Sequence, residues 1–509
     1  MNTTSYFASS SRRARRPMAL LVAGVAGSWA AHAVAQPAPT CEGEACEPAG
    51  VNAAAGAQPA PDAAGALGDS SEAVVALEAE ALAAEGPEAE ALVDRSNDVD
   101  ALGELTGRRW TLKGKVTSQT TGYLVDRDAP GEGQGWIGEV RLELNAQLSP
   151  ELSARVRPWL LLDAFDPDVL RYEPLEAHLD YTAERWDVRV GQFIESWGIV
   201  DTVNPLDILN RTDLAVDALS PPRRGEAGVR VRAHGEGGDV VGQPSVGLYL
   251  MPLFRETDFP SEGSRMRPRP PGGVLVPAKG VRPDGAEALL AAIRAEHTLS
   301  TPWLNADVQY ILARGPSHAP ALGVLPQPDG SLQFAPDYFG TYTVGGGFRA
   351  VPNGRLSALT FKAEVAYVRP YQFAAQSGGL PEDFLRLAAG VSRSFVLDSA
   401  AELNVNLEVL GELLADDALA KTRLFGNDVA VRLAWAANDP ALTALEVRAI
   451  VDWQDGTVLG NLVARRQLLA LHQDLQLELD AQFAHVGDDT ATALPSNPTA
   501  LIGRLVFAF

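Results

Sequence analysis

Apolar and polar side chains alternate along residues 136–148 with a period of two, which is the period of a β-strand. Ser149-Pro150 ends this stretch and the alternation resumes over 151–164, so the two stretches predict a β-hairpin. Thirteen residues are long for a sandwich strand of about 5–6 residues, but they suit a tilted membrane crossing of roughly 9–11 residues. The pattern favours a barrel strand with lipid on its apolar face and a wet lumen on its charged face.

The same alternation recurs from Trp110 to the end of the chain, in about eighteen stretches. Short gaps between the stretches alternate with mostly longer ones, which is typical of an all-β, antiparallel, up-and-down transmembrane barrel. This order requires 291–299 to be a strand despite its Ala and Leu content; if it is a helix, sixteen strands are expected. The predicted strands are 110–123, 136–148, 151–164, 172–181, 186–197, 227–233, 246–253, 291–299, 304–312, 338–350, 356–368, 384–395, 402–413, 429–435, 445–453, 457–466, 475–485 and 501–509.

The last stretch alternates and closes in Phe509, which resembles the terminal strand by which outer-membrane barrels are recognised for insertion. The resemblance implies the barrel-insertion machinery as a partner. Pro158 interrupts the third strand, where its missing N–H predicts a bulge that re-aims Arg155 and Arg157. Several tryptophans stand at strand ends, where the aromatic girdles of such barrels lie: Trp110, Trp136, Trp186, Trp197, Trp303 and Trp453.

Residues 1–35 resemble a secretory signal peptide. Four arginines between Arg12 and Arg16 precede an apolar stretch from Met18 to Ala31, and Ala33-Val34-Ala35 supplies small residues for cleavage. Beyond this stretch no run of about eighteen apolar residues occurs, so no membrane-spanning helix is expected. A barrel explains how an integral membrane protein can have a mean hydropathy near zero.

Residues 36–107 are rich in Ala, Gly, Pro and acid, with fifteen Asp and Glu against Arg95 alone. Such a composition cannot bury a core, so it predicts a largely disordered periplasmic arm, with an arm that plugs the lumen or touches the cell wall as the alternative. Cys41 and Cys46 lie in this arm, and an oxidising compartment would permit a small disulfide loop. The barrel domain is expected to cover 108–509.

The chain has a net charge of −23, of which about −13 belongs to residues 108–509. No basic stripe with interleaved aromatic residues occurs, and an acidic chain would be repelled by phosphate, so a nucleic-acid partner is not expected. Outer-membrane lipid and small polar solutes are the partners that the pattern favours. The sequence decides neither the solute nor whether the barrel is a monomer or a homotrimer.

A combination of Gly191-Gln192, Trp197-Gly198 and Asn204-Pro205-Leu206-Asp207 runs from the fifth strand into the loop after it. It resembles the strand-loop signature of porin-like outer-membrane proteins of Gram-negative bacteria. The likeness covers about thirty residues, in addition to the barrel pattern over some four hundred. It implies a channel-type barrel, with no particular substrate.

The loop over 198–224 is too apolar to lie entirely in solvent, so we expect it to fold back against the barrel wall. Its charged residues Asp201, Asp207, Arg211, Asp213 and Asp217 would then face arginines of the wall. Strand parity predicts the lumen residues Arg155, Arg157, Glu176, His178, Asp180, Asp187, Arg189, Arg230 and Arg232. In the alternative, Trp197 is a girdle residue and Asn204-Pro205 forms a simple turn.

These residues favour a passive diffusion channel whose selectivity depends on the inward loop and the lumen charges. An enzyme is not expected, because neither Gly-x-Ser-x-Gly nor His-Glu-x-x-His occurs among the 509 residues. No cofactor or metal is expected, since no second histidine stands at ligand spacing from His178. The remaining alternative is a structural or partner-binding barrel that its loops and acidic arm close.

Overall fold

The computed structural model describes most of the chain from Arg109 to Phe509. The described residues are 109–124, 134–164, 170–214, 216, 221–260, 273–276, 280, 282–326, 332–373, 382–413, 427–454, 456–485 and 499–509. All of them belong to one compact unit, Leu67–Phe509. The predicted signal peptide, acidic arm and disulfide between Cys41 and Cys46 lie outside the described residues.

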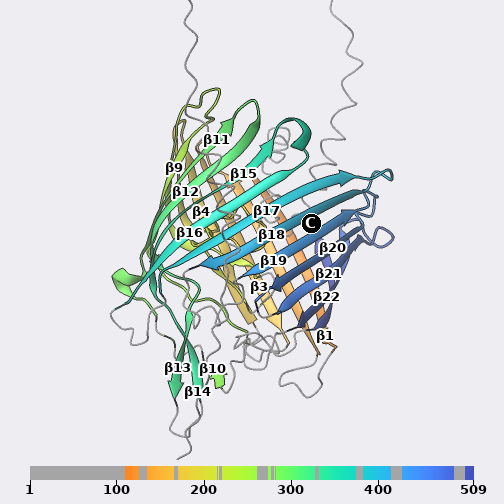
Figure 1. The fold of residues 1–509 in the computed structure, drawn as a ribbon. Coiled ribbons are helices and arrows are strands. Elements are labelled where there is room, and N and C mark those ends of the chain that lie inside the picture. Colours follow the sequence, from red (N-terminus) through yellow and green to blue (C-terminus); the bar gives the residue numbers. More distant parts are fainter. Residues whose placement is uncertain are drawn as a thin grey trace, which may run out of the picture. The chain divides into compact units, whose positions relative to one another are not determined.

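Eighteen antiparallel strands form one sheet in which each strand pairs with the next along the chain, and β1 pairs with β23 to close a barrel. Figure 1 shows β16, β17, β18 and β19 lying side by side and slanted in the same direction. The strands are β1 (Trp110–Tyr123), β2 (Gln134–Gln147), β3 (Leu152–Asp163), β4 (Leu170–Thr182), β5 (Trp186–Phe193), β8 (Glu226–His234), β9 (Ser245–Met251), β11 (Leu290–Ser300), β12 (Leu304–Pro316), β15 (Gly340–Pro352), β16 (Thr360–Tyr371), β17 (Phe384–Val396), β18 (Glu402–Leu413), β19 (Asp428–Ala436), β20 (Ala444–Asp452), β21 (Val458–Gln467), β22 (Leu475–His485) and β23 (Ala500–Ala508).

The expected eighteen-stranded barrel is confirmed, and each predicted stretch corresponds to one of these strands. The segment 291–299 lies in β11, so the alternative with sixteen strands is wrong. Tertiary pairing decides its conformation, because β11 pairs with β9 on one side and with β12 on the other. The bounds differ by a few residues; β5, for example, ends at Phe193 rather than at Trp197.

The two faces of the barrel wall have opposite chemistry. Along β22, Leu477, Leu479 and Phe483 are exposed on the outside, whereas the alternate residues Glu478 and Asp480 are buried inside. The same inversion recurs around the barrel, where most exposed large apolar residues lie on the outer face. A soluble barrel buries its apolar face, so this wall is built for hydrocarbon outside and a polar interior.

The bulge next to Pro158 lies on the neighbouring strand, not on β3. Arg157 pairs with Glu176 and Pro158 pairs with Pro174, so Leu175 of β4 is the extra residue. Glu173 and Glu176 can therefore both face the interior although their spacing is odd. The expectation that Arg155 and Arg157 are re-aimed is wrong, because the parity of β3 continues unchanged through Trp159.

Five shorter strands lie outside the barrel sheet. β6 (Arg211–Thr212) pairs with β7 (Arg223–Arg224), and β10 (Gly273–Leu275), β14 (Leu332–Asp337) and β13 (Ala321–Pro326) form a three-stranded sheet. Two 3-10 helices, η2 (Gly285–Ala288) and η3 (Gly354–Leu356), complete the described elements. No helix of these described segments has the length and apolar character needed to span a membrane.

Five of the six tryptophans expected in the girdle have exposed side chains, as a girdle requires. The side chains of Trp110, Trp136, Trp186, Trp303 and Trp453 are exposed at strand ends. Trp197 is completely buried, so its place in the girdle was a wrong expectation. It follows the end of β5 and lies inside the barrel.

Candidate functional site

Four neighbouring strands carry a ladder of ion pairs along their inner faces. Arg157 of β3 donates to Glu176 of β4 over 2.9 Å, and Arg189 of β5 donates to Asp180 of β4 over 2.6 Å. The ring nitrogen Nε2 of His178 lies 3.2 Å from Asp180 Oδ2. Strand pairing places these groups opposite one another, since Arg189 is the register partner of Asp180.

The ladder continues onto β8 through Glu195, which follows β5. Arg230 donates to Glu195 and, over 2.6 Å, to Asp187. Arg232 Nη2 lies 3.9 Å from Glu195 Oε2, and His234 Nε2 lies 2.8 Å from Asp187 Oδ2. The strand residues predicted from parity therefore meet on one side of the barrel, with Arg155 at the edge bonded to Asn145 over 2.8 Å.

The chain after β5 turns inward and follows the inner wall. The carboxylate of Glu364 on β16 accepts the backbone N–H of Ile199, that of Val200 over 3.0 Å and that of Leu206 over 3.1 Å. Glu408 on β18 accepts the N–H of Asp201 over 2.6 Å and that of Thr202 over 2.9 Å. Two wall carboxylates thus satisfy five backbone donors of a segment that has no regular structure of its own.

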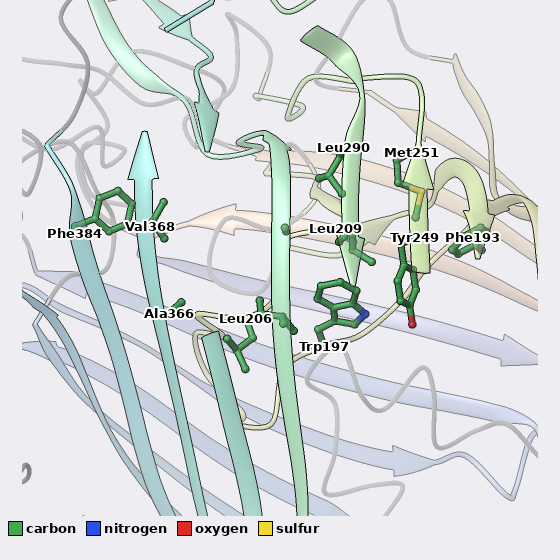
Figure 2. Packing of buried hydrophobic residues seen from close by; sticks show 13 residues of the cluster. Phe193, Trp197, Leu206, Leu209, Tyr249, Met251, Leu290, Ala366, Val368 and Phe384 are labelled. Carbon is green, nitrogen blue, oxygen red and sulfur yellow. The ribbon is translucent and has the colours of Figure 1, made fainter. Parts of the chain in front are cut away.

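The apolar side chains of this inward segment are buried in a hydrophobic cluster. Trp197 lies against Tyr249 of β9 (Figure 2), and the two rings pack edge-on with centroids 4.9 Å apart. Burial of such side chains stabilises the arrangement by about 1.5–3 kcal/mol each. The cluster comprises Phe193, Trp197, Leu206, Leu209, Tyr249, Met251, Leu290, Ala292, Ile311, Ala313, Ala366, Val368 and Phe384.

Two residues of the sequence motif, Gly198 and Asn204, meet at this segment. A Cβ on Gly198 would lie 2.2 Å from the Asn204 side chain, so only glycine permits this approach. The amide of Gln192 donates to the Pro174 carbonyl over 2.5 Å, and Pro205 is buried. Asn204-Pro205 is therefore part of a packed segment and not a simple turn in solvent.

The charged residues of the segment do not pair as expected. Asp207 pairs with Arg223 and Asp213 pairs with Arg224, so their arginines belong to the returning part of the same loop and not to the wall. Asp201 meets Lys362 of β16, which is a lysine of the wall. Asp217 lies outside the described residues.

Arg211 of the same loop bridges to the wall and to another loop. Its guanidinium contacts Glu173 of β4 at 2.6 Å and Glu226 of β8 at 3.3 Å, and it also pairs with Asp258. Arg224 lies with its guanidinium carbon 3.6 Å from the ring centroid of Trp159 on β3. The β6–β7 hairpin is therefore fixed to the inner face next to the ladder.

Sequence reasoning missed a second charged network on β19 to β23. Arg432 donates to Glu446 over 2.8 Å and Arg465 donates to Glu478 over 2.8 Å. Arg504 of β23 also pairs with Glu478 and donates to Gln119 of β1 over 2.7 Å. Strand parity, applied to every strand, would have found these residues.

No protein-family model matches the chain, and no curated protein matches it. Solved structures with a similar arrangement include OccK9 (OpdG) of Pseudomonas aeruginosa, with a TM-score of 0.45 and 9% identity over 79% of this chain and 97% of that one. OccAB4 of Acinetobacter baumannii has a TM-score of 0.44 and 10% identity over 79% and 97%.

Wzi, an outer-membrane protein of Escherichia coli that is involved in group 1 capsule assembly and is a carbohydrate-binding β-barrel, has a TM-score of 0.44. Its identity is 12% over 83% of this chain and 89% of that one. Likenesses at this level assign neither a family nor a function to this chain.

Proposed function

We propose that this protein is an outer-membrane channel through which small polar or charged solutes diffuse passively. The observation that carries the proposal is the inverted barrel wall, which has apolar side chains exposed outside and ion-paired side chains inside. Lys115 and Asp307 are solvent-exposed although their strand parity directs them inward. Water inside the barrel accounts for this combination.

The inward segment and the lumen charges would set selectivity. Residues 199–206 lie against β16 and β18 and reduce the cross-section of the lumen on that side. The ladder residues Arg155, Arg157, Glu176, His178, Asp180, Arg189, Arg230 and Arg232 line the opposing strands together with their partners. Charged groups that line a narrow lumen would orient polar solutes as they pass.

Reconstitution of the purified protein in planar bilayers tests the channel. We expect discrete conductance steps from a sample that shows heat-modifiable migration on a gel, which is the sign of a folded barrel. Reversal potentials in asymmetric salt would then give the ion preference. A folded sample without conductance steps would rule out an open channel.

The second candidate is a barrel closed by its own loops that binds a partner or anchors the envelope. Trp197, Leu206 and Leu209 are buried inside the barrel, so the inward loop fills part of the interior. This observation favours a closed barrel. Deleting residues 37–107 separates the two functions. Conductance that emerges only after the deletion would support a barrel that the arm closes.

A further inference from the structure

The outer face of the barrel carries two arginines with a tyrosine between them, on three adjacent strands. Tyr342 of β15 is the register partner of Arg314 on β12 and of Arg369 on β16. The three residues therefore form one cross-strand row, and the two arginine Cα atoms are about 10 Å apart. Two guanidinium groups at this spacing can approach a common phosphate.

The side chains of this row point away from the lumen. The preceding row of the same face is Leu312, Val344 and Tyr367, all of them large and exposed. Alternate residues of the same strands, such as Ala313 and Val368, are buried inside the barrel. Arg314 and Arg369 are likewise exposed, so the row lies on the lipid-facing side.

The row lies where the apolar belt ends. From the exposed Trp303 at the other end of β12, the chain to Arg314 covers roughly 36 Å along the strand and about 28 Å along the axis of a barrel with strands tilted by about 40°. The apolar band of such barrels is about 25 Å tall. Arg314 and Arg369 therefore lie at the level of lipid headgroups, where a charged side chain on the outer face is tolerated.

Neighbouring aromatic rings hold one of the arginines in place. The guanidinium carbon of Arg314 lies 5.7 Å from the ring centroid of Tyr342 and 5.4 Å from that of Tyr371. One guanidinium N–H is directed at the Tyr371 hydroxyl, and the other N–H donors of the five can bind an anion. Within the described segments neither arginine of the row forms an ion pair, and the nearby carboxylate of Asp383 bonds to the Tyr367 hydroxyl over 2.5 Å.

We propose that Arg314, Tyr342 and Arg369 bind the phosphate headgroup of an anionic membrane lipid on the outside of the barrel. The arginines would donate to the phosphate oxygens, and the tyrosine ring between them would pack against the headgroup on the side of the barrel wall. The acyl chains would then lie along Leu312 and Val344. The inference rests on the membrane placement proposed above and does not depend on channel activity.

Native mass spectrometry of the folded full-length protein in detergent tests the site. The probe is lipid A, a phosphorylated glycolipid, compared with phosphatidylcholine and with inorganic phosphate as a soluble competitor. We expect lipid A to bind more tightly than phosphatidylcholine. The Arg314→Gln/Arg369→Gln variant should bind lipid A at least about tenfold more weakly, because both charge-assisted contacts are lost.

A matched control removes two outward arginines from the opposite end of the strands. Arg393→Gln/Arg466→Gln deletes the same charge from β17 and β21 and should leave lipid A affinity within about twofold of the wild type. Equal loss in the control variant, equal affinity for both lipids, or full displacement by inorganic phosphate would each overturn the proposal.

Conductance and heat-modifiable migration, measured on the same samples, separate this proposal from the proposed function. The double variant should retain both properties. A wild-type sample that binds lipid A selectively without conductance would contradict the channel alone. A sample without heat-modifiable migration would contradict the membrane placement on which both proposals depend.

Discussion

Gly191 of β5 lies where the surrounding backbone leaves no room for a side chain. Its φ is +136°, a conformation that favours glycine, and a Cβ there would lie 2.2 Å from the Ala177 carbonyl oxygen and 2.7 Å from the His178 Cα. Both contacts are with backbone atoms of β4, which cannot move without disturbing the strand pairing. The first glycine of the sequence motif is therefore a requirement of the barrel wall.

We predict that Gly191→Ala destabilises the folded barrel by roughly 2 kcal/mol or more, because it adds a backbone clash to an unfavourable φ. The urea midpoint of the folded band on a gel gives the loss. Gly354→Ala is the matched control, since Gly354 has a φ of +81° but no atom within 4 Å of its Cβ position. Equal losses in the two variants would show that close packing at Gly191 contributes nothing.

Among the described wall residues, Glu364 accepts the most backbone N–H groups of the inward segment. A carboxylate can accept from Ile199, Val200 and Leu206 together, whereas an amide presents one oxygen and one N–H₂ group to the same three donors. Glu364→Gln therefore leaves at least one buried N–H unpaired. The same substitution would leave Glu408 and its two donors unchanged.

We predict that Glu364→Gln weakens the anchorage of residues 199–206 by about 1–3 kcal/mol, which is the cost of an unpaired buried donor. Single-channel recordings should show more open-state current noise, because the segment leaves the wall more often. Glu402→Gln, on the inner face of β18, removes the same charge without touching the segment. Unchanged noise in Glu364→Gln would contradict its role as an anchor.

At the scale of elements, each strand could be predicted because apolar and polar side chains alternate within the strand itself. The prediction of β11 as a strand required only the additional rule that the strands of a barrel come in pairs. The bulge of β4 is visible in the sequence as the odd spacing of the inward residues Glu173 and Glu176. The contacts of the inward loop could not be predicted. Glu364 lies 164 residues from Val200, and no local pattern shows which of many inward carboxylates meets it.

Parts of the segments between barrel strands pack together around Phe254, Thr257, His318 and Tyr338. The ring of His318, after β12, stacks on Phe254, with ring centroids 5.3 Å apart. Thr257 donates its hydroxyl to the His318 carbonyl over 2.7 Å and its N–H to the Tyr338 hydroxyl over 3.1 Å. Burial lowers the pKa of His318 from 6.5 to about 4, so the packed unit favours the neutral ring.

We predict that this packing loosens as the pH falls from 6.5 towards 4. In that window the unfolded segment binds a proton more readily than the packed one, so stability is full above pH 6.5 and is lost on acidification. Hydrogen exchange of residues 252–260, corrected for its intrinsic pH dependence, should speed up by about tenfold. His318→Phe keeps the stack on Phe254 and should remove this pH dependence; if it does not, another group titrates.

At the scale of the whole molecule, charged side chains from many strands together determine the electrostatic potential inside the barrel. Lys115 of β1 is exposed and faces the lumen on the strand next to the second network, in register with Arg141 of β2. We predict that Lys115→Glu raises the preference for cations by a factor on the order of two, with Lys115→Gln between it and the wild type. Reversal potentials in asymmetric potassium chloride measure the shift. Arg393→Gln, on the outer face, should not change them.

The outer face of the same wall is a continuous apolar belt, and its depth dependence tests the placement in a bilayer. Leu479 is 46% exposed at the middle of β22, whereas Leu471 is 73% exposed in the turn before it. An arginine at the middle of the belt costs roughly 2–4 kcal/mol, and one near the interface costs about 0–1 kcal/mol. In water, arginine at these two exposed sites would cost little at either.

We predict that Leu479→Arg lowers the unfolding free energy of the protein in lipid vesicles by about 2–4 kcal/mol, and that Leu471→Arg changes it by no more than about 1 kcal/mol. Guanidinium titrations, read from the heat-modifiable gel shift, give both values. The difference between the two variants depends on hydrocarbon around β22, because the strand pairing and inner face are the same in both. Equal costs would mean that the belt faces something other than lipid, and the channel proposal would fail with it.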